Sequence, residues 1–120
     1  MEDNEGVRFL PNWVFGDVTF EDIFIYNTSL FSVHPGALLP SKDRLWYLRI
    51  ELSRLEEFPW DVLPEFISLT NLNLDVNELK NVPPLQSPTL ESLYIRQNRI
   101  SKIAPGWSLP SLKELSLREW

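Results

Sequence analysis

The 120-residue sequence contains no cysteine and a single histidine, His34. The absence of cysteine excludes disulfides, cysteine-ligated metal sites and thiol nucleophiles. A lone histidine gives neither a metal-ligand set nor a base–nucleophile pair to build on. We therefore expect no metal, no cofactor and no catalytic residue in this chain.

Glycine and basic residues are also scarce. The chain has 4 glycines, none of them in a phosphate-binding loop, and 11 Lys and Arg against 17 Asp and Glu, for a net charge of −6. Nucleic acids and anionic membrane surfaces need a basic footprint on the protein that binds them. We expect neither as a partner.

Long hydrophobic runs are absent as well. The apolar runs are a few residues long, far short of the roughly 20 residues of a membrane span, so we expect no membrane insertion. The chain opens with Met-Glu-Asp-Asn-Glu, which is acidic where a secretory leader is basic, and we expect no signal peptide in it. Hydrophobic residues still make up 43% of the sequence, enough for a folded core.

One apolar pattern recurs along the chain. The pattern Leu-x-x-Leu-x-Leu-x-x-Asn-x-Leu, with Ile accepted for Leu, is complete in LTNLNLDVNEL (69–79) and LESLYIRQNRI (90–100). LWYLRIELSRL (45–55) and FEDIFIYNTSL (20–30) keep its apolar positions, and LKELSL (112–117) begins a fifth unit. This pattern, at a period of 20–29 residues, is the signature of leucine-rich repeats. The units start at Phe20, Leu45, Leu69, Leu90 and Leu112.

A second feature repeats in phase with the first. Three residues after the last apolar position of each of the first four units comes another apolar residue, and a proline follows within two residues. Residues 7–11 fit the same tail. We therefore predict a partial first repeat or N-terminal remnant over residues 1–19, and a leucine-rich-repeat array over residues 20–120 that is truncated at the C-terminus.

The alternation of apolar residues in Leu-x-Leu predicts short β-strands with one buried face. Such strands bury that face by stacking in parallel, and proline-rich return segments disfavour regular helices, apart from a helical turn expected at 59–67. The predicted fold class is an α/β-type leucine-rich-repeat solenoid, with short parallel strands on the concave side and irregular or short-helical convex backs. Its inward residues Leu48, Leu72, Leu93 and Leu115 should line up in successive strands.

The Asn position of the pattern predicts a structural ladder. A side-chain amide there can satisfy backbone groups in the turn after each strand. A hydroxyl can supply part of that bonding. The predicted ladder residues are Thr28, Ser53, Asn77 and Asn98.

The residues between the inward positions should face the concave side. They include many Tyr, Phe and Arg side chains, which are over-represented at interface hot spots, although an ordinary solvated strand face has a similar mixed composition. We predict that a protein partner binds on this face. The candidate binding residues are Phe24, Tyr26, Tyr47, Arg49, Glu51, Asp75, Tyr94 and Arg96.

Asn27-Thr28-Ser29 is an N-glycosylation sequon. Asn27 is therefore a candidate glycosylation site, on the condition that the chain enters the secretory pathway.

Three stretches carry a closer resemblance: FIYNTSLFSVHPGALLP (24–40), LWYLRIELSRLEEFPWDVLPEFISLTNLNLDVNEL (45–79) and NVPPLQSPTLESLYIRQNRISKIAPGW (81–107). They resemble arthropod leucine-rich-repeat proteins similar to the non-catalytic subunit of decapod shrimp luciferase, a luciferin monooxygenase. The resemblance implies a secreted, extracellular, non-enzymatic protein that associates with other proteins. Catalysis in that family lies on a different subunit, so no catalytic residue carries over.

Two alternatives remain open. The runner-up to the secreted binding module is a fragment of a leucine-rich-repeat receptor or matrix ectodomain, and a third alternative is a cytosolic leucine-rich-repeat adaptor. Solenoids need polar caps, whereas Leu10 and Leu115 would lie on open terminal faces. We therefore expect self-association through these uncapped ends, or marginal stability of the isolated chain.

Overall fold

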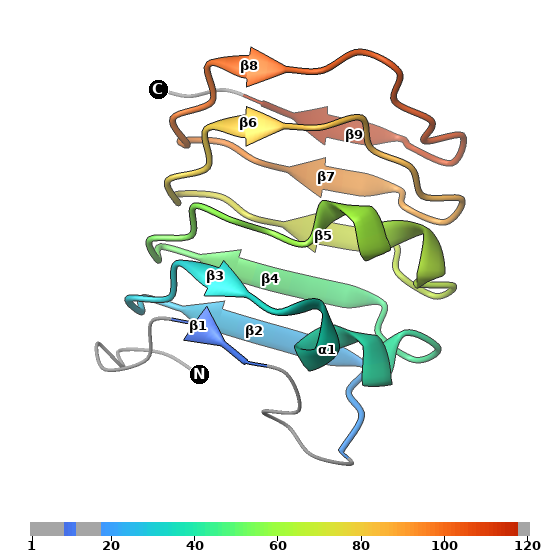
Figure 1. Ribbon diagram of the computed structural model, residues 1–120. Coiled ribbons are helices and arrows are strands. Elements are labelled where there is room, and N and C mark those ends of the chain that lie inside the picture. The colour runs from blue at the N-terminus through green and yellow to red at the C-terminus, as the bar shows by residue number, and fades with distance from the viewer. Residues whose placement is uncertain (1–8, 12–17, 118–120) are drawn as a thin grey trace.

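A parallel sheet of five strands runs through the computed structural model (Figure 1). The structure describes residues 9–11 and 18–117, so most of the predicted partial repeat over residues 1–19 lies outside the described residues. The strands follow one another across the sheet in chain order. They are β2 (Asp22–Tyr26), β4 (Tyr47–Glu51), β5 (Asn71–Asn73), β7 (Ser92–Tyr94) and β9 (Glu114–Ser116).

The inward leucines of neighbouring strands are register partners. Leu48 pairs with Leu72, Leu72 with Leu93, and Leu93 with Leu115, which is the alignment that the sequence predicts. Leu48, Leu72 and Leu93 are at most 1% exposed, and each such burial contributes roughly 1.5–3 kcal/mol. Leu115, in the last described strand, is 43% exposed.

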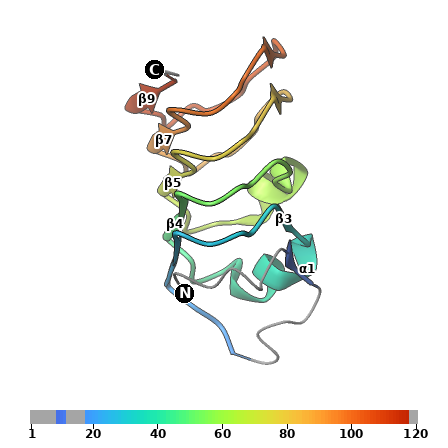
Figure 2. The ribbon, with the colours of Figure 1, turned by 90° about the vertical axis from the view of Figure 1, so that its left-hand side faces the viewer.

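The return segments lie on the opposite side of the core from this sheet (Figure 2). Two pairs of very short parallel strands are found there. In one pair β1 (Phe9–Leu10) lies beside β3 (Ser32–Val33), and in the other β6 (Asn81–Val82) lies beside β8 (Lys102–Ile103). The chain therefore alternates between a sheet strand and a return segment.

Short helices occupy the first two return segments. The 3₁₀-helix η2 (Trp60–Glu65) falls within the turn predicted at 59–67. The helices α1 (Pro35–Leu38) and η1 (Leu39–Ser41) were not predicted. Helix α1 forms because His34 caps it, Nδ1 accepting the Gly36 N–H at 2.9 Å, and because proline is tolerated in a first turn.

The core fills the space between the sheet and the return segments. Leu38, Leu63, Phe66 and Leu85 from the return side are all at most 1% exposed and belong to the same hydrophobic cluster as the inward strand residues. One continuous interior therefore holds successive units together.

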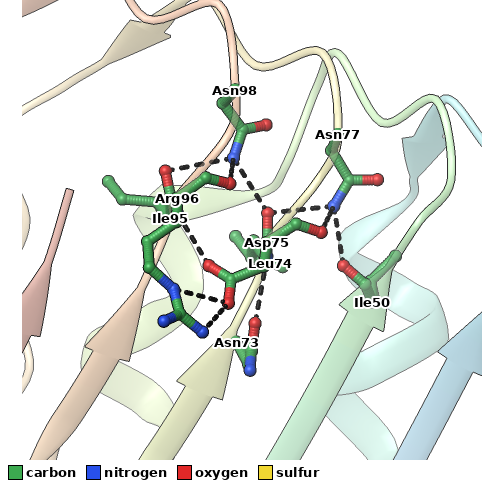
Figure 3. A network of polar contacts seen from close by, with 8 residues as sticks. All are labelled: Ile50, Asn73, Leu74, Asp75, Asn77, Ile95, Arg96 and Asn98. Carbon is green, nitrogen blue, oxygen red and sulfur yellow. Dashed lines mark hydrogen bonds and ion pairs between the residues drawn. The ribbon is translucent and has the colours of Figure 1, made fainter. Parts of the chain in front are cut away.

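The two asparagines of the repeat pattern bind backbone groups in the turns after β5 and β7 (Figure 3). Asn77 Nδ2 donates to the carbonyls of Leu74 at 2.9 Å and of Ile50, one unit earlier, at 2.7 Å. Asn98 Nδ2 donates in the same way to Ile95 and, one unit earlier, to Leu74. Each amide thus ties its own turn to the preceding strand.

Hydroxyl groups occupy the equivalent place in the first two units. Thr28 Oγ1 and Ser53 Oγ lie 2.9 Å apart, Thr28 Oγ1 accepts the Leu30 N–H at 3.2 Å, and Ser53 Oγ donates to the Glu51 carbonyl at 3.1 Å. These two side chains thus bond to each other across the units as well as to main chain, and Ser53 Oγ also accepts the Thr28 N–H at 3.3 Å.

The residue before each ladder position has a left-handed backbone. The φ angles are 56° at Asn27, 51° at Leu52, 57° at Val76 and 55° at Gln97. Asn adopts this conformation readily, whereas a β-branched residue does so only under strain. The same turn therefore recurs whatever side chain stands there, and Val76 is its most strained member.

Candidate functional site

The outer face of the five-stranded sheet is the side that points away from the core. Strand residues alternate between buried and partly exposed along β2 and β4, because successive side chains of a strand point to opposite sides. The outward positions of β2, β4, β5 and β7 include six of the predicted binding residues. These are Phe24, Tyr26, Tyr47, Arg49, Glu51 and Tyr94.

Arg49 lies between two aromatic rings at the centre of β4. Its Cζ is 4.2 Å from the centroid of the Phe24 ring and 4.3 Å from that of Tyr47. Its Nη2 donates to both carboxylate oxygens of Asp22, at 3.1 and 3.3 Å. Cation–π contact and an ion pair both fix this guanidinium, and the Arg49 side chain as a whole is 26% exposed.

Further rings extend this contact on both sides. The Tyr26 centroid is 5.6 Å from that of Phe24, and the Trp46 centroid is 5.4 Å from that of Tyr47. Phe24 and Trp46 are 41% and 45% exposed. We call the set Asp22, Phe24, Tyr26, Trp46, Tyr47 and Arg49 the Arg49 cluster.

Trp46 was not among the predicted binding residues. It directly follows the start of a unit, a position that the repeat pattern does not direct toward the outer face. The signal that could have found it is its place next to Tyr47 in the aromatic pair of LWYL.

A second cluster lies across β5 and β7 and contains Asp75, Tyr94 and Arg96; Figure 3 shows the contact between Asp75 and Arg96. Arg96 donates to Asp75 from its backbone N–H at 2.7 Å, from Nε at 3.0 Å and from Nη2 at 2.6 Å. The Arg96 Cζ is 5.3 Å from the centroid of the Tyr94 ring. The hydrogen bonds and the charge of Asp75 raise the pKa of Arg96 above its ordinary value.

Asp75 differs from the expectation that it faces a partner. It is only 4% exposed, and Arg96 takes up its carboxylate. A buried carboxylate needs such a partner because desolvation of an unpaired charge is costly. Asp75 therefore positions Arg96, and the guanidinium is what this cluster presents to solvent.

Glu51 lies at the end of β4, in register with Tyr26 of β2. Partial burial raises the pKa of its carboxyl, the nearby charge of Asp75 raises it further, and Arg49 and Arg96 oppose the shift. Glu51 is thus close enough to both clusters for the charges of Arg49, Asp75 and Arg96 to shift the pKa of its carboxyl.

Asn27 stands at the end of β2 and is exposed. The following Thr28 is 6% exposed. Within the sequon, Asn27 is therefore accessible to solvent, whereas Thr28 is buried and is one of the ladder residues.

Within residues 9–11 and 18–117, no group of three or more His, Asp or Glu side chains is placed to hold a metal ion. Among the same residues, no helix has the length and apolar character to cross a membrane.

Fold and face together define a parallel-strand protein that presents aromatic and arginine side chains on the outside of its sheet. Over 119 residues the chain is 30% identical to the Oplophorus-luciferin 2-monooxygenase non-catalytic subunit of Oplophorus gracilirostris. The match covers 97% of this chain and 33% of that protein, so the chain spans about a third of the length of the curated relative it matches. No protein-family model and no solved structure matches the chain.

Proposed function

We propose that the chain is a non-catalytic binding module and that a protein partner binds to the outer face of its sheet. The observation that carries this proposal is the Arg49 cluster. The Phe24 and Tyr47 rings flank a guanidinium that is already fixed by these two cation–π contacts and an ion pair, and the exposed Trp46 ring extends the surface from Tyr47. Rigid aromatic and arginine side chains lose little conformational entropy on binding and dominate interface hot spots.

The proposal includes the leucine-rich-repeat solenoid as the fold class. Three observations support it: one sheet strand per sequence unit, register pairing of the inward leucines, and equivalent bonding by Asn77 and Asn98. A solenoid exposes one long strand face, which is the surface such proteins use for binding.

The similarity to a subunit named as non-catalytic supports the non-enzymatic part of the proposal. For the full-length protein we propose kinship with that subunit and an extracellular location. The exposed Asn27 supports this location over the cytosolic adaptor. Expression through a secretory pathway should give a product that shifts on glycosidase treatment, and Asn27→Gln should abolish the shift. An unshifted wild-type product would favour the cytosolic alternative.

The binding role is tested with the partner itself. The purified chain is cross-linked in an extract of its source tissue, the attached protein is identified and produced, and its affinity is measured by calorimetry. Tyr47→Ala, Arg49→Ala and Tyr94→Ala should each weaken binding by about 1–2 kcal/mol or more without lowering the melting temperature by a matching amount. The matched control is Glu65→Ala, an exposed position on η2 at the back of the molecule. Unchanged affinity in all three face variants would refute the proposal.

A further inference from the structure

The charges on the outer face are not evenly paired. Asp22 pairs with Arg49 at 3.1 Å, and Asp75 pairs with Arg96 at 2.6 Å. Glu51 lies between these pairs, and within the described part of the chain its carboxylate forms no ion pair or side-chain hydrogen bond. Both arginines near it are already bound to other carboxylates.

The surroundings of Glu51 are partly apolar. Tyr26 of β2 is its register partner, and the Tyr26 ring contacts that of Phe24. The other titratable or charged groups that face it are Arg49 on its own strand, Asp75 after β5 and Arg96 after β7. Glu51 is therefore a partly buried carboxylate whose cross-strand neighbour on the same face is an aromatic residue.

We propose that the protein partner places a basic side chain, arginine or lysine, against Glu51, with the apolar stem of that side chain lying on Tyr26. This inference rests on the proposed binding role of the outer face and names the chemistry of the partner.

Charge complementarity supports this choice. The chain carries a net charge of −6, so its field attracts a basic partner. Glu51 is a negative group of the face whose charge no ion pair takes up, and closure of an interface over it would leave a buried unpaired charge unless the partner supplied a cation.

The molecule already contains an example of the same chemistry. The Arg49 guanidinium lies on the Phe24 and Tyr47 rings and pairs with the carboxylate of Asp22. Tyr26 and Glu51 offer a ring and a carboxylate on the same two strands. A basic side chain of the partner would repeat the contact that Arg49 makes.

A basic side chain bound at Glu51 would change the protonation of this carboxyl. A bound cation favours the ionised form of Glu51, so the pKa of that carboxyl falls in the complex. Binding then releases a proton wherever the pH lies between the bound and the free pKa. Affinity for a basic ligand should rise with pH through this range and level off above it.

The test is selection of phage-displayed random dodecapeptides on the purified chain and on three variants. Glu51→Gln removes the charge, Glu51→Lys reverses it, and Glu65→Gln removes a carboxylate on the back of the molecule as the matched control. Wild type and Glu65→Gln should enrich peptides rich in Arg and Lys, whereas Glu51→Gln should not and Glu51→Lys should favour acidic peptides. A synthetic basic peptide from the wild-type pool should bind Glu51→Gln about tenfold more weakly.

The outcomes separate this inference from the proposed function. Equal enrichment of basic peptides by wild type and Glu51→Gln, or enrichment of neutral peptides by wild type, overturns the role of Glu51. If those same peptides lose affinity for Trp46→Ala and Tyr47→Ala, the binding role of the face survives. Peptides that bind both of these variants like wild type, or no enrichment on any form of the chain, overturn the binding role as well.

Discussion

Arg96 and Asp75 form an ion pair in which one partner is buried and the other is not. The side chain of Asp75 is 6% exposed and that of Arg96 is 48% exposed. Removal of Arg96 and removal of Asp75 should therefore have unequal effects on the stability of the chain. Arg96→Ala leaves a buried carboxylate with fewer donors, whereas Asp75→Ala leaves an exposed cation that water can solvate.

We accordingly expect Arg96→Ala to destabilise the chain more than Arg99→Ala, the matched control in the next turn, which is 70% exposed and pairs loosely with Glu78. A double-mutant cycle of Asp75→Ala and Arg96→Ala in urea should give a coupling free energy of roughly 1–3 kcal/mol. A coupling near zero would contradict the positioning role of Asp75.

Asn98 should be among the most sensitive polar residues. Its amide donates to Leu74, Ile95 and Arg96 carbonyls, and its Oδ1 accepts the Leu79 N–H. Asn98→Ala leaves these buried groups unpaired and should lower the free energy of unfolding by about 2–4 kcal/mol. Asn81→Ala, an exposed asparagine on β6, should change it little in the same denaturation series. Equal effects of the two would argue against the ladder.

The inward leucines should differ along the sheet. Leu93→Ala opens a cavity at a position that is 0% exposed and should cost about 2–5 kcal/mol. The register partner Leu115 is 43% exposed, so Leu115→Ala should cost clearly less. Chemical denaturation of both variants checks the order, and a reversed order would contradict the register of β7 and β9.

Val76 offers a stabilising substitution. Its backbone has φ 57°, which is costly for a β-branched residue but ordinary for asparagine. Val76→Asn should raise the free energy of unfolding by about 1 kcal/mol. The same exchange at Val18, which is exposed but outside the left-handed positions, serves as control and should have little effect. Thermal melts suffice, and a destabilised Val76→Asn would show that side-chain packing outweighs the strain.

Glu51 should make stability depend on pH. Its pKa is raised above the ordinary value of 4.5 in the folded chain, so the folded state holds this proton more tightly than the unfolded state. The stabilising contribution of the protonated group is full below the unfolded pKa and is lost as pH rises through the folded pKa. Glu51→Gln should therefore be more stable than wild type at pH 7, by a margin that shrinks as pH falls toward 4.5. Glu65→Gln should show no such trend.

Much of the arrangement follows from the spacing of apolar residues. Leu48, Leu72 and Leu93 recur at equivalent positions of their units and are register partners, because a buried strand face tolerates no slip by one residue. The bonding of Asn77 and Asn98 follows from the same spacing. Helix α1 does not follow from the spacing of apolar residues, because it depends on the local cap by His34. The repeat pattern contains no signal for that cap.

The outer face was less predictable than the core. Alternation places Arg49 and Phe24 outward, but the stacking of one on the other depends on side-chain conformations that no period encodes. Glu51, Asp75 and Arg96 all precede a left-handed residue, but of these three only Asp75 is buried, with its carboxylate bonded to Arg96, and the repeat pattern does not encode that pairing. Trp46 was missed since its ring reaches the Tyr47 ring from outside the alternating positions.

The change from amides to hydroxyls along the ladder bears on binding. A hydroxyl has one hydrogen to donate and an amide has two, so the ladder contact between Thr28 and Ser53 makes fewer hydrogen bonds than the one that Asn98 makes. The Arg49 cluster spans β2 and β4, the two strands that this hydroxyl contact joins. A partner bound across Phe24 and Tyr47 would contact β2 and β4 at once. Its binding free energy would therefore stabilise the pairing of these two strands.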